Sequence, residues 1–328
     1  GNYGLPPEES SFGIHALITA HYQHGAWYPV GGAGRIAAEI KKTIEANGGA
    51  IQCGKTVKQI LVDNDNRAIG VRTADKFLSG AKSDILAPLI ISDVGIRATY
   101  NLIPGNKASA AVKNAIDQFP TGRSAVTLYL GLAESPAKFG LCGENVWLNE
   151  SYEIDTVTAT AHLLTGAPTS AYISFPSLKN PVTRTHTAEI IAMVDTNGFD
   201  LWRESSWRRR PADYEALKKT ITDGLIKFVN RHIHGFAAII SYAELSTPLS
   251  IEHFTGRARG EMYGLAETPE RLKIDWLGPD TPIKNLYLAG SDAFSLGIEG
   301  AFMGGLMTAA RATGMLGLER LIWSVLRN

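Results

Sequence analysis

Hydrophobic residues near the start of the chain recur at helical spacing. Ile36, Ile40 and Ile44 lie one turn apart, which predicts an amphipathic helix over residues 34–46. The Asn-Gly-Gly sequence at 47–49 is expected to end this helix, because Asn and Gly tolerate the left-handed conformation found at helix ends.

The spacing then changes to that of strands. Residues 57–63 and 67–73 flank a short polar turn and predict a β-hairpin. The nearly continuous apolar run at 85–92 predicts a strand that is buried on both faces.

The middle of the chain favours an antiparallel sheet. The expected strands are 124–132, 145–149, 170–176, 189–195 and 237–244. One helix interrupts them at 211–229, with Pro211 in its first turn. Its apolar face consists of Tyr214, Leu217, Ile221, Leu225 and Phe228.

The end of the chain returns to a strand followed by a helix. Residues 285–290 predict a short apolar strand that closes with Gly290, and a long helix begins at about Ile298. Small residues along this helix would let it pack closely against a sheet or a ligand. The mixture of strands and helices predicts an α/β fold.

Composition narrows the class of protein. The chain has 328 residues, 45% of them hydrophobic, with a formal net charge of +0, which is typical of a globular protein with one large or two medium domains. A balanced charge argues against a nucleic-acid partner. No apolar stretch reaches the ~18–20 residues of a membrane span. The first residues also lack the basic and apolar regions of a signal peptide, so we expect a cytoplasmic protein.

Cysteine and histidine usage offers no metal or disulfide chemistry. Cys53 and Cys142 are too few for a disulfide framework or a thiolate zinc site. His232 and His234 follow a helix end, and no acidic or cysteine partner has ligand spacing to them. We therefore expect no metal ion.

One glycine motif imitates a dinucleotide-binding loop. Gly32, Gly34 and Ala37 fit G-x-G-x-x-[GA], but Pro29 precedes them where a central strand is required. Twenty residues beyond Gly32 lies Gln52, where the motif calls for a carboxylate. The motif is therefore not the start of a Rossmann unit, and no other stretch of the chain supplies one.

The same loop resembles a different pattern. Residues 28–71 have a Tyr-Pro-x-Gly-Gly turn, a helix, and a "V-x-x-I" strand and hairpin, as in the phytoene desaturase, carotenoid isomerase and retinol saturase family of FAD-dependent oxidoreductases. Residues 2–22 resemble the segment before that turn in retinol saturases, and residues 246–265 and 281–305 resemble the family's C-terminal signature. The resemblance is weakest over 105–235.

The resemblance implies an α/β fold of the amine-oxidase and phytoene-desaturase type, or α+β if the chain is a fragment. It would have an incomplete FAD/NAD(P)-binding domain and an antiparallel-sheet substrate domain. Its implied division gives residues 1–25 to a substrate-domain segment and 26–104 to the FAD-binding domain. Residues 105–280 form the substrate domain, and 281–328 return to the FAD-binding domain. Because family members open with a strand–GxGxxG–helix unit, the chain resembles their C-terminal part.

The resemblance also assigns residues to an FAD site. Asp292, after Gly290, matches the family's Gly-x-Asp that contacts FAD, while an Asp that caps a turn is the alternative. Glu299 is expected to point away or to cap the following helix. The first turn of that helix would offer free N–H groups and its positive dipole end to the flavin through Ile298, Gly300 and Ala301.

Three further residues are assigned through their backbone. By resemblance, Val57 begins the strand that offers backbone groups to the adenine. Gly31 and Gly32 would permit close approach to the isoalloxazine or the substrate, and plain turn glycines are the alternative.

The implied activity is saturation, desaturation or isomerisation of a C=C bond in a polyene or related lipid. It would proceed by hydride exchange at the flavin N5 atom with a proton moved at the other carbon. An apolar tunnel along the central sheet would have Tyr129, Phe175 and Tyr242 in its wall, although core packing explains these residues equally well.

Other classes of function remain open. Without the first dinucleotide-binding unit, the chain could be a non-catalytic lipophile-binding or interaction module, or half of a complex whose partner chain supplies that unit. A plain amine oxidase is a third alternative. The basic stretch 203–211 and the amphipathic residues 316–326 are a solvated loop and a docked helix, or else contacts with a membrane surface.

Overall fold

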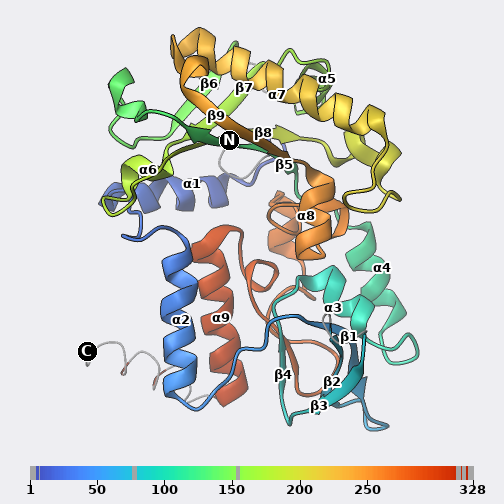
Figure 1. The fold of residues 1–328 in the computed structure, drawn as a ribbon. Helices are drawn as coiled ribbons and strands as arrows, with labels where there is room; N and C mark the ends of the chain where they lie inside the picture. The colour runs from blue at the N-terminus through green and yellow to red at the C-terminus, as the bar shows by residue number, and fades with distance from the viewer. Residues whose placement is uncertain are drawn as a thin grey trace.

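The computed structural model describes residues 5–6, 8–75, 80–152, 156–314, 319 and 323. Two regions are visible in Figure 1, a five-stranded sheet with its helices and a second region built around smaller sheets. The predicted helix at 316–326 lies outside the described residues, except for Glu319 and Trp323.

The first region is an antiparallel sheet with the strand order β6-β7-β8-β5-β9. Its strands are β5 (Ser124–Leu132), β6 (Val146–Asn149), β7 (Ser170–Ser174), β8 (His186–Val194) and β9 (Ile240–Ser246). The five strands predicted from the middle of the chain are confirmed, although β9 begins three residues later than expected. The order places β8 and β5 at the centre of the sheet.

Helices cover one face of this sheet, and a further helix lies on the side of the other face. In Figure 1, α5 (Thr156–Leu164) and α7 (Ala212–His232) lie above the sheet, and α1 (Phe12–His21) lies below it. The predicted apolar face of α7 is confirmed, because Tyr214, Ile221, Leu225 and Phe228 are buried and Leu217 packs against the same cluster. Alternate residues of β5 and β8 point into this core, which fixes their register.

The second region contains a three-stranded meander and a parallel pair of strands. The meander runs β1 (Lys55–Val62), β2 (Ala68–Asp75) and β3 (Lys82–Leu86). The parallel pair is β4 (Ile90–Ser92) and β10 (Leu286–Leu288). The helices of this region are α2 (Gly34–Ala46), α3 (Ile96–Leu102), α4 (Ala110–Gln118) and α9 (Gly297–Thr313). Two shorter helices, α6 (Pro176–Lys179) and α8 (Pro248–Thr255), belong to the sheet region and its junction with the second.

The predicted hairpin, helix 34–46 and C-terminal helix are confirmed, but the prediction of one buried strand at 85–92 is wrong. Ile85 and Leu86 end β3 and are exposed, and β4 begins only at Ile90. Pro88 separates the two strands, because it has no N–H to donate and holds the residue before it extended. An apolar run therefore serves two different sheets.

Helix α2 is amphipathic, but none of its residues is buried. Ile40 and Ile44 are 43% and 36% exposed, and Phe302 on α9 is 54% exposed. Apolar side chains of both helices are therefore exposed.

Candidate functional site

The carboxyl ends of the parallel strands carry the candidate site. Asp93 follows β4, and Gly290, Ser291 and Asp292 follow β10. Because the two strands are parallel, these residues meet at one edge of the sheet. In open α/β sheets, this edge is where ligands bind.

Asp292 is 3% exposed and binds the chain's own backbone. Its Oδ2 accepts a hydrogen bond from the N–H of Ile96 at 2.8 Å, and its Oδ1 accepts one from the N–H of Leu265 at 3.1 Å. Ile96 is the first residue of α3, where an N–H lacks a partner within the helix. The carboxylate thus joins the end of β10 to α3 and to the loop at 265.

Glycines make room for these carboxylates. A Cβ at Gly290 would lie 1.7 Å from Asp93 Oδ1, and a Cβ at Gly264 would lie 2.2 Å from Asp292 Oδ1. Gly290 has a φ of 79° and Gly264 a φ of 83°, which L side chains rarely adopt. At both positions, the site therefore requires glycine for space as well as for conformation.

Arg257 lies close to Asp292 and also acts electrostatically on Asp93. Its Nη1 is 3.5 Å from Asp292 Oδ2, and its Nη2 donates to Ser291 Oγ at 3.4 Å. Burial raises the pKa of Asp93, Arg257 offsets part of that rise, and the charge on Asp292 adds to it. The guanidinium therefore offsets part of the negative charge of the two carboxylates.

A buried ion pair supports the loops around the site. Arg271 and Glu267 have side chains that are each 1% exposed, with Arg271 Nε 3.3 Å from Glu267 Oε1. Arg271 also donates to the carbonyl oxygens of Leu265 and Ser291, each at 2.8 Å. Glu267 Oε1 accepts the N–H of Leu296 at 3.0 Å, next to the start of α9. The pair thus fixes the loops that precede and follow Asp292.

Glu261 is a second buried carboxyl group nearby. Its Oε2 lies 3.7 Å from Arg97 Nη1, and neither atom has a hydrogen-bond partner among the described residues. Burial is the main reason that the pKa of Glu261 rises to about 7, and Arg97 partly offsets it. This carboxyl group therefore changes its charge near neutral pH.

The start of α9 lies close to the same loop. A Cβ at Gly304 would lie 2.2 Å from the carbonyl oxygen of Gly290, and one at Gly300 would lie 2.0 Å from that of Ser295. Ile298 is exposed and Ala301 partly exposed in the first turn. The Oε2 atom of Glu299 lies 2.9 Å from Nδ1 of His21 on α1.

The predicted turn residues lie elsewhere. Gly31 and Gly32 have φ values of 96° and 86°, so the turn needs left-handed residues. The N–H of Gly31 donates to Asn180 Oδ1 at 3.1 Å, which connects the turn to the end of α6. Val57 is partly exposed in β1, next to an irregularity in its pairing with β2. These three residues do not join the cluster around Asp292.

The expected tunnel residues are divided between the two faces of the sheet. Tyr129 and Tyr242 are 45% and 59% exposed, and Tyr242 pairs with Gly131, two residues from Tyr129 on β5. Phe175 is fully buried among the core side chains on the helix-covered side and contacts Phe236 edge-on. The structure therefore keeps Phe175 apart from the other two, and core packing accounts for it.

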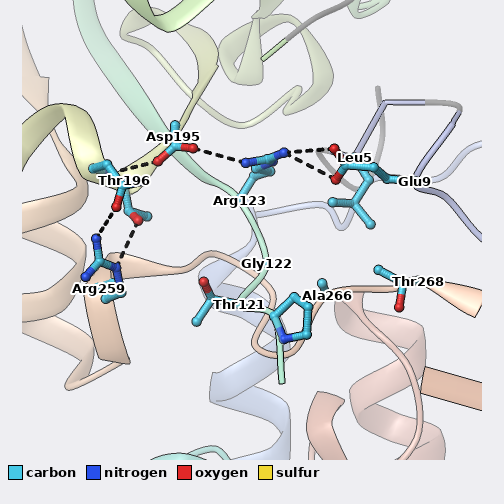
Figure 2. A pocket seen from close by; sticks show the side chains of 12 residues that line it. Leu5, Glu9, Thr121, Gly122, Arg123, Asp195, Thr196, Arg259, Ala266 and Thr268 are labelled. Carbon is cyan, nitrogen blue, oxygen red and sulfur yellow. Dashed lines mark hydrogen bonds and ion pairs between the residues drawn. The ribbon is translucent and has the colours of Figure 1, made fainter. Parts of the chain in front are cut away.

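A polar cavity of about 300 Å³ lies at another place, between residues 120–123 and 195–197. Figure 2 shows Arg123 between Asp195 and Glu9, at 3.2 Å from each carboxylate. Arg259 lies across the cavity and donates to Thr196 Oγ1 at 3.2 Å. Arg259 also pairs with Asp200, so each charged residue that lines this cavity already has a partner of opposite charge.

The basic stretch near residue 207 is also tied into the fold. The ring of Trp207 stacks on His253 with the ring centroids 4.8 Å apart, and Arg208 lies over Trp207. Arg203 binds the carboxylates of Asp200 and Glu252. Among the described residues, no helix is long and apolar enough to cross a membrane. Within the same ranges, no group of three or more His, Cys, Asp or Glu side chains is placed to hold a metal ion.

Two residues of the site were missed from the sequence. Asp93 directly follows the apolar run at 85–92, and an acidic residue at the end of a strand is a signal that could have found it. Arg257 gives no comparable signal, because nothing in the sequence separates it from Arg259 two residues later.

Known proteins resemble the chain in sequence although no family model matches it. It is 30% identical over 322 residues to all-trans-retinol 13,14-reductase of Danio rerio, covering 93% of this chain and 52% of that protein. It is 24% identical to the chloroplastic prolycopene isomerase of Daucus carota, with 93% and 46% covered. It is also 24% identical to the lycopene-forming phytoene desaturase of Pseudescherichia vulneris, with 94% and 58% covered. The chain thus spans about half the length of the curated relatives it matches.

Solved structures agree on the fold. A variant of putrescine oxidase superposes with a TM-score of 0.55 at 16% identity, covering 87% of this chain and 53% of that one. An oxidoreductase from Methanosarcina mazei gives a TM-score of 0.53 at 19% identity, with 84% and 53% covered. The predicted α/β fold of the amine-oxidase type is therefore confirmed. The sequence relatives support the family of phytoene desaturases, carotenoid isomerases and retinol saturases for this chain.

Proposed function

We propose that the chain forms part of an FAD-dependent oxidoreductase that acts on a C=C bond of a polyene or related isoprenoid lipid. The names of its relatives support the substrate class, since they refer to retinol, prolycopene and phytoene. The proposed substrate is a lipophilic small molecule. The neutral net charge gives no reason to expect a nucleic acid.

The observation that carries the proposal is the meeting of Asp93, Arg257 and Asp292 at the carboxyl ends of β4 and β10. FAD brings anionic phosphates and ribityl hydroxyl groups. A guanidinium and the first turn of α9 suit the anionic part. An accessible carboxylate such as Asp93 suits a hydroxyl group.

Asp292 has a different part in this proposal. Because it is 3% exposed and each of its oxygens already accepts a backbone N–H, it holds the loops that face the cofactor. Gly290 leaves room for the carboxylate of Asp93 beside it. Gly300 lets the start of α9 lie close to the carbonyl oxygen of Ser295. We keep Ile298, Ala301, Gly31, Gly32 and Val57 as proposed cofactor-facing positions through their backbone groups.

When bound, FAD supplies hydride exchange at its N5 atom. The chain's own residues position the substrate and exclude water. The exposed face of the five-stranded sheet, where Tyr129 and Tyr242 lie, is the proposed wall for the polyene.

A second candidate is half of a split flavoenzyme, with a partner polypeptide that supplies the strand–GxGxxG–helix unit. Helix α2 supports it, because the helix is amphipathic and none of its residues is buried within the described part of the chain. Both candidates place the cofactor at the same strand ends, and they differ in whether FAD binding requires the added polypeptide.

The experiment is gel filtration of the protein with FAD, alone and with a polypeptide carrying the dinucleotide-binding unit of a relative, while the visible flavin absorption is recorded. We expect the flavin band to elute with the protein in at least one of the two mixtures. If it elutes in neither, the proposal is wrong.

Variants then locate the site. Asp93→Asn should weaken FAD binding about tenfold, the effect of losing one charge-assisted hydrogen bond. Asp292→Ala should also weaken it, by releasing the loops. Asp65→Asn, on an exposed turn, is the control and should bind FAD as the unmodified protein does. Unchanged flavin retention in Asp93→Asn and Asp292→Ala would contradict the assignment of the site.

A further inference from the structure

The face of the five-stranded sheet opposite α7 carries a group that the proposed function does not use. On β8, Ala188, Ile190 and Ala192 point into the core, so Glu189 lies on the opposite face. Its pairing partners across the sheet are Tyr129 on β5 and Ser174 on β7. Glu189 is therefore a carboxyl group at the centre of the sheet, on β8 between β7 and β5.

Aromatic rings surround this carboxyl group. Tyr172 on β7 lies two residues from Ser174, the residue that pairs with Glu189. The ring of Trp147 on β6 contacts the ring of Tyr172 edge-on, with 4.8 Å between the centroids. Burial raises the pKa values of Tyr129, Tyr172 and Tyr263 above the ordinary value, which places their hydroxyl groups in partly dry surroundings. Trp147 and Tyr129 are each 45% exposed, so rings on this face are accessible to a ligand.

Lys179 is the cation of this face. Its Nζ donates to Ser174 Oγ at 2.7 Å and to Asn145 Oδ1, and it lies 5.6 Å above the ring of Tyr28. Glu189 and Lys179 attract each other, but they are not within ion-pair distance. Burial lowers the pKa of Lys179 and raises that of Glu189, and the charge on the other partly offsets each shift.

Glu189 accepts no hydrogen bond from any residue that the structure describes, although it is half-buried. A carboxyl group in such surroundings is destabilised unless a donor satisfies it. Glu244 provides a contrast. It pairs with Tyr129 from the other side, but Lys218 donates to its Oε1 at 3.0 Å. Of these two carboxyl groups beside Tyr129, Glu189 is the one left for a ligand.

We propose that this face binds a polyene that carries a hydroxyl group, and that Glu189 accepts a hydrogen bond from this hydroxyl group. Glu189 is then a specificity-determining residue. Trp147, Tyr129 and Tyr172 contact the chain of the polyene next to its polar end. The proposal rests on the proposed function for the polyene class, and it adds the polar end group and the residue that selects it.

The charges on this face set an order among ligands. An alcohol donates a hydrogen bond to Glu189, whereas its methyl ether has the same polyene but no hydrogen to donate. The corresponding carboxylic acid, when ionised, places a second negative charge beside Glu189. The expected order of affinity is alcohol, then ether, then acid.

The test is a titration of the protein with all-trans-retinol, its methyl ether and the corresponding acid, followed by quenching of tryptophan fluorescence. We expect the alcohol to bind about tenfold more tightly than the ether, as for one buried hydrogen bond to a charged group. Glu189→Leu should remove this preference while it retains polyene binding. Glu189→Gln, which keeps an acceptor oxygen, should retain part of it.

Glu244→Gln is the matched control and should keep the full preference, because Lys218 already occupies its carboxylate. Thermal melting of each variant reports on folding separately from binding. Equal affinity for alcohol and ether, or an unchanged preference in Glu189→Leu, would overturn the proposal. If that occurs while FAD co-elutes as expected above, the proposed function stands and only this inference fails. If none of the three polyenes binds, the inference and the polyene substrate class fail together, and FAD retention still tests the oxidoreductase.

Discussion

The two regions of this molecule contain similar helices that the fold uses in different ways. Helix α7 has an apolar face that is buried against the five-stranded sheet, with six of its residues buried. Helix α2 has an apolar face at the same helical spacing, but none of its residues is buried. The comparison teaches that an amphipathic pattern predicts a helix with a face to cover, while the covering partner depends on the rest of the fold.

The regions also differ in what holds them together. The sheet region has an apolar core from β5, β8 and α7. The second region has a smaller apolar core, with Asp93, Arg257, Asp292 and the pair Glu267–Arg271 at the ends of its parallel strands. Packing therefore fixes the first region, whereas charged hydrogen bonds fix the loops of the second, where the cofactor is proposed to bind.

The largest expected effect is a loss of stability in the sheet region, which is the better packed of the two. Phe228 on α7 is 1% exposed in the core, so Phe228→Ala should lower the free energy of unfolding by about 3–5 kcal/mol. Urea unfolding monitored by circular dichroism measures this loss. A loss below about 1 kcal/mol would show that the core relaxes around the cavity and that α7 contributes less than its burial indicates.

The next largest expected effect is a dependence of stability on pH that comes from the buried carboxyl group of Glu261. The pKa of Glu261 in the folded protein is about 7, above its ordinary 4.5, because burial favours the protonated form. Between these two values, the folded state holds a proton that the unfolded state releases. The free energy of unfolding should therefore fall as the pH rises from 4.5 to 7, by roughly 1–3 kcal/mol.

The measurement is urea unfolding at pH 5 and pH 8, compared with Glu261→Gln. The variant keeps a neutral side chain of similar shape, so its stability should depend less on pH over this range. Asp93, Glu189 and Glu267 also have pKa values raised by burial and remain in both proteins, so the difference between the proteins isolates Glu261. An identical pH dependence in the two proteins would contradict the prediction.

Much of this fold could be predicted from the sequence where spacing decides it. The periodicity of α7 and the alternation in β5 gave elements that the structure confirms, because one buried face imposes each pattern. The run at 85–92 failed because apolar content does not say which sheet a residue joins. The run is divided because its first part pairs with β2 and its last part pairs with β10, and these two strands lie far apart in the sequence.

The candidate site was less predictable for the same reason. Gly290 and Asp292 could be singled out because they follow a strand in a stretch that resembles the family signature. Their contacts with Ile96 and Leu265 join segments far apart in the chain, and spacing does not reveal such contacts. Glu189 begins a predicted strand as an ordinary polar position, and only the pairing with Tyr129 and Ser174 shows its surroundings.

The smallest expected effect is a change of stability in α2, none of whose residues is buried. Ile40 on α2 is 43% exposed, so Ile40→Ser should change the free energy of unfolding by about 0.5 kcal/mol or less. Ile60 on β1, in the same region but 1% exposed, is the matched control, and Ile60→Ser should cost several times more. Urea unfolding of both variants makes the comparison. A large loss in Ile40→Ser would contradict the prediction and mean that α2 is covered in solution. If that loss disappears on dilution, a second polypeptide supplies the cover, because only an intermolecular contact depends on protein concentration.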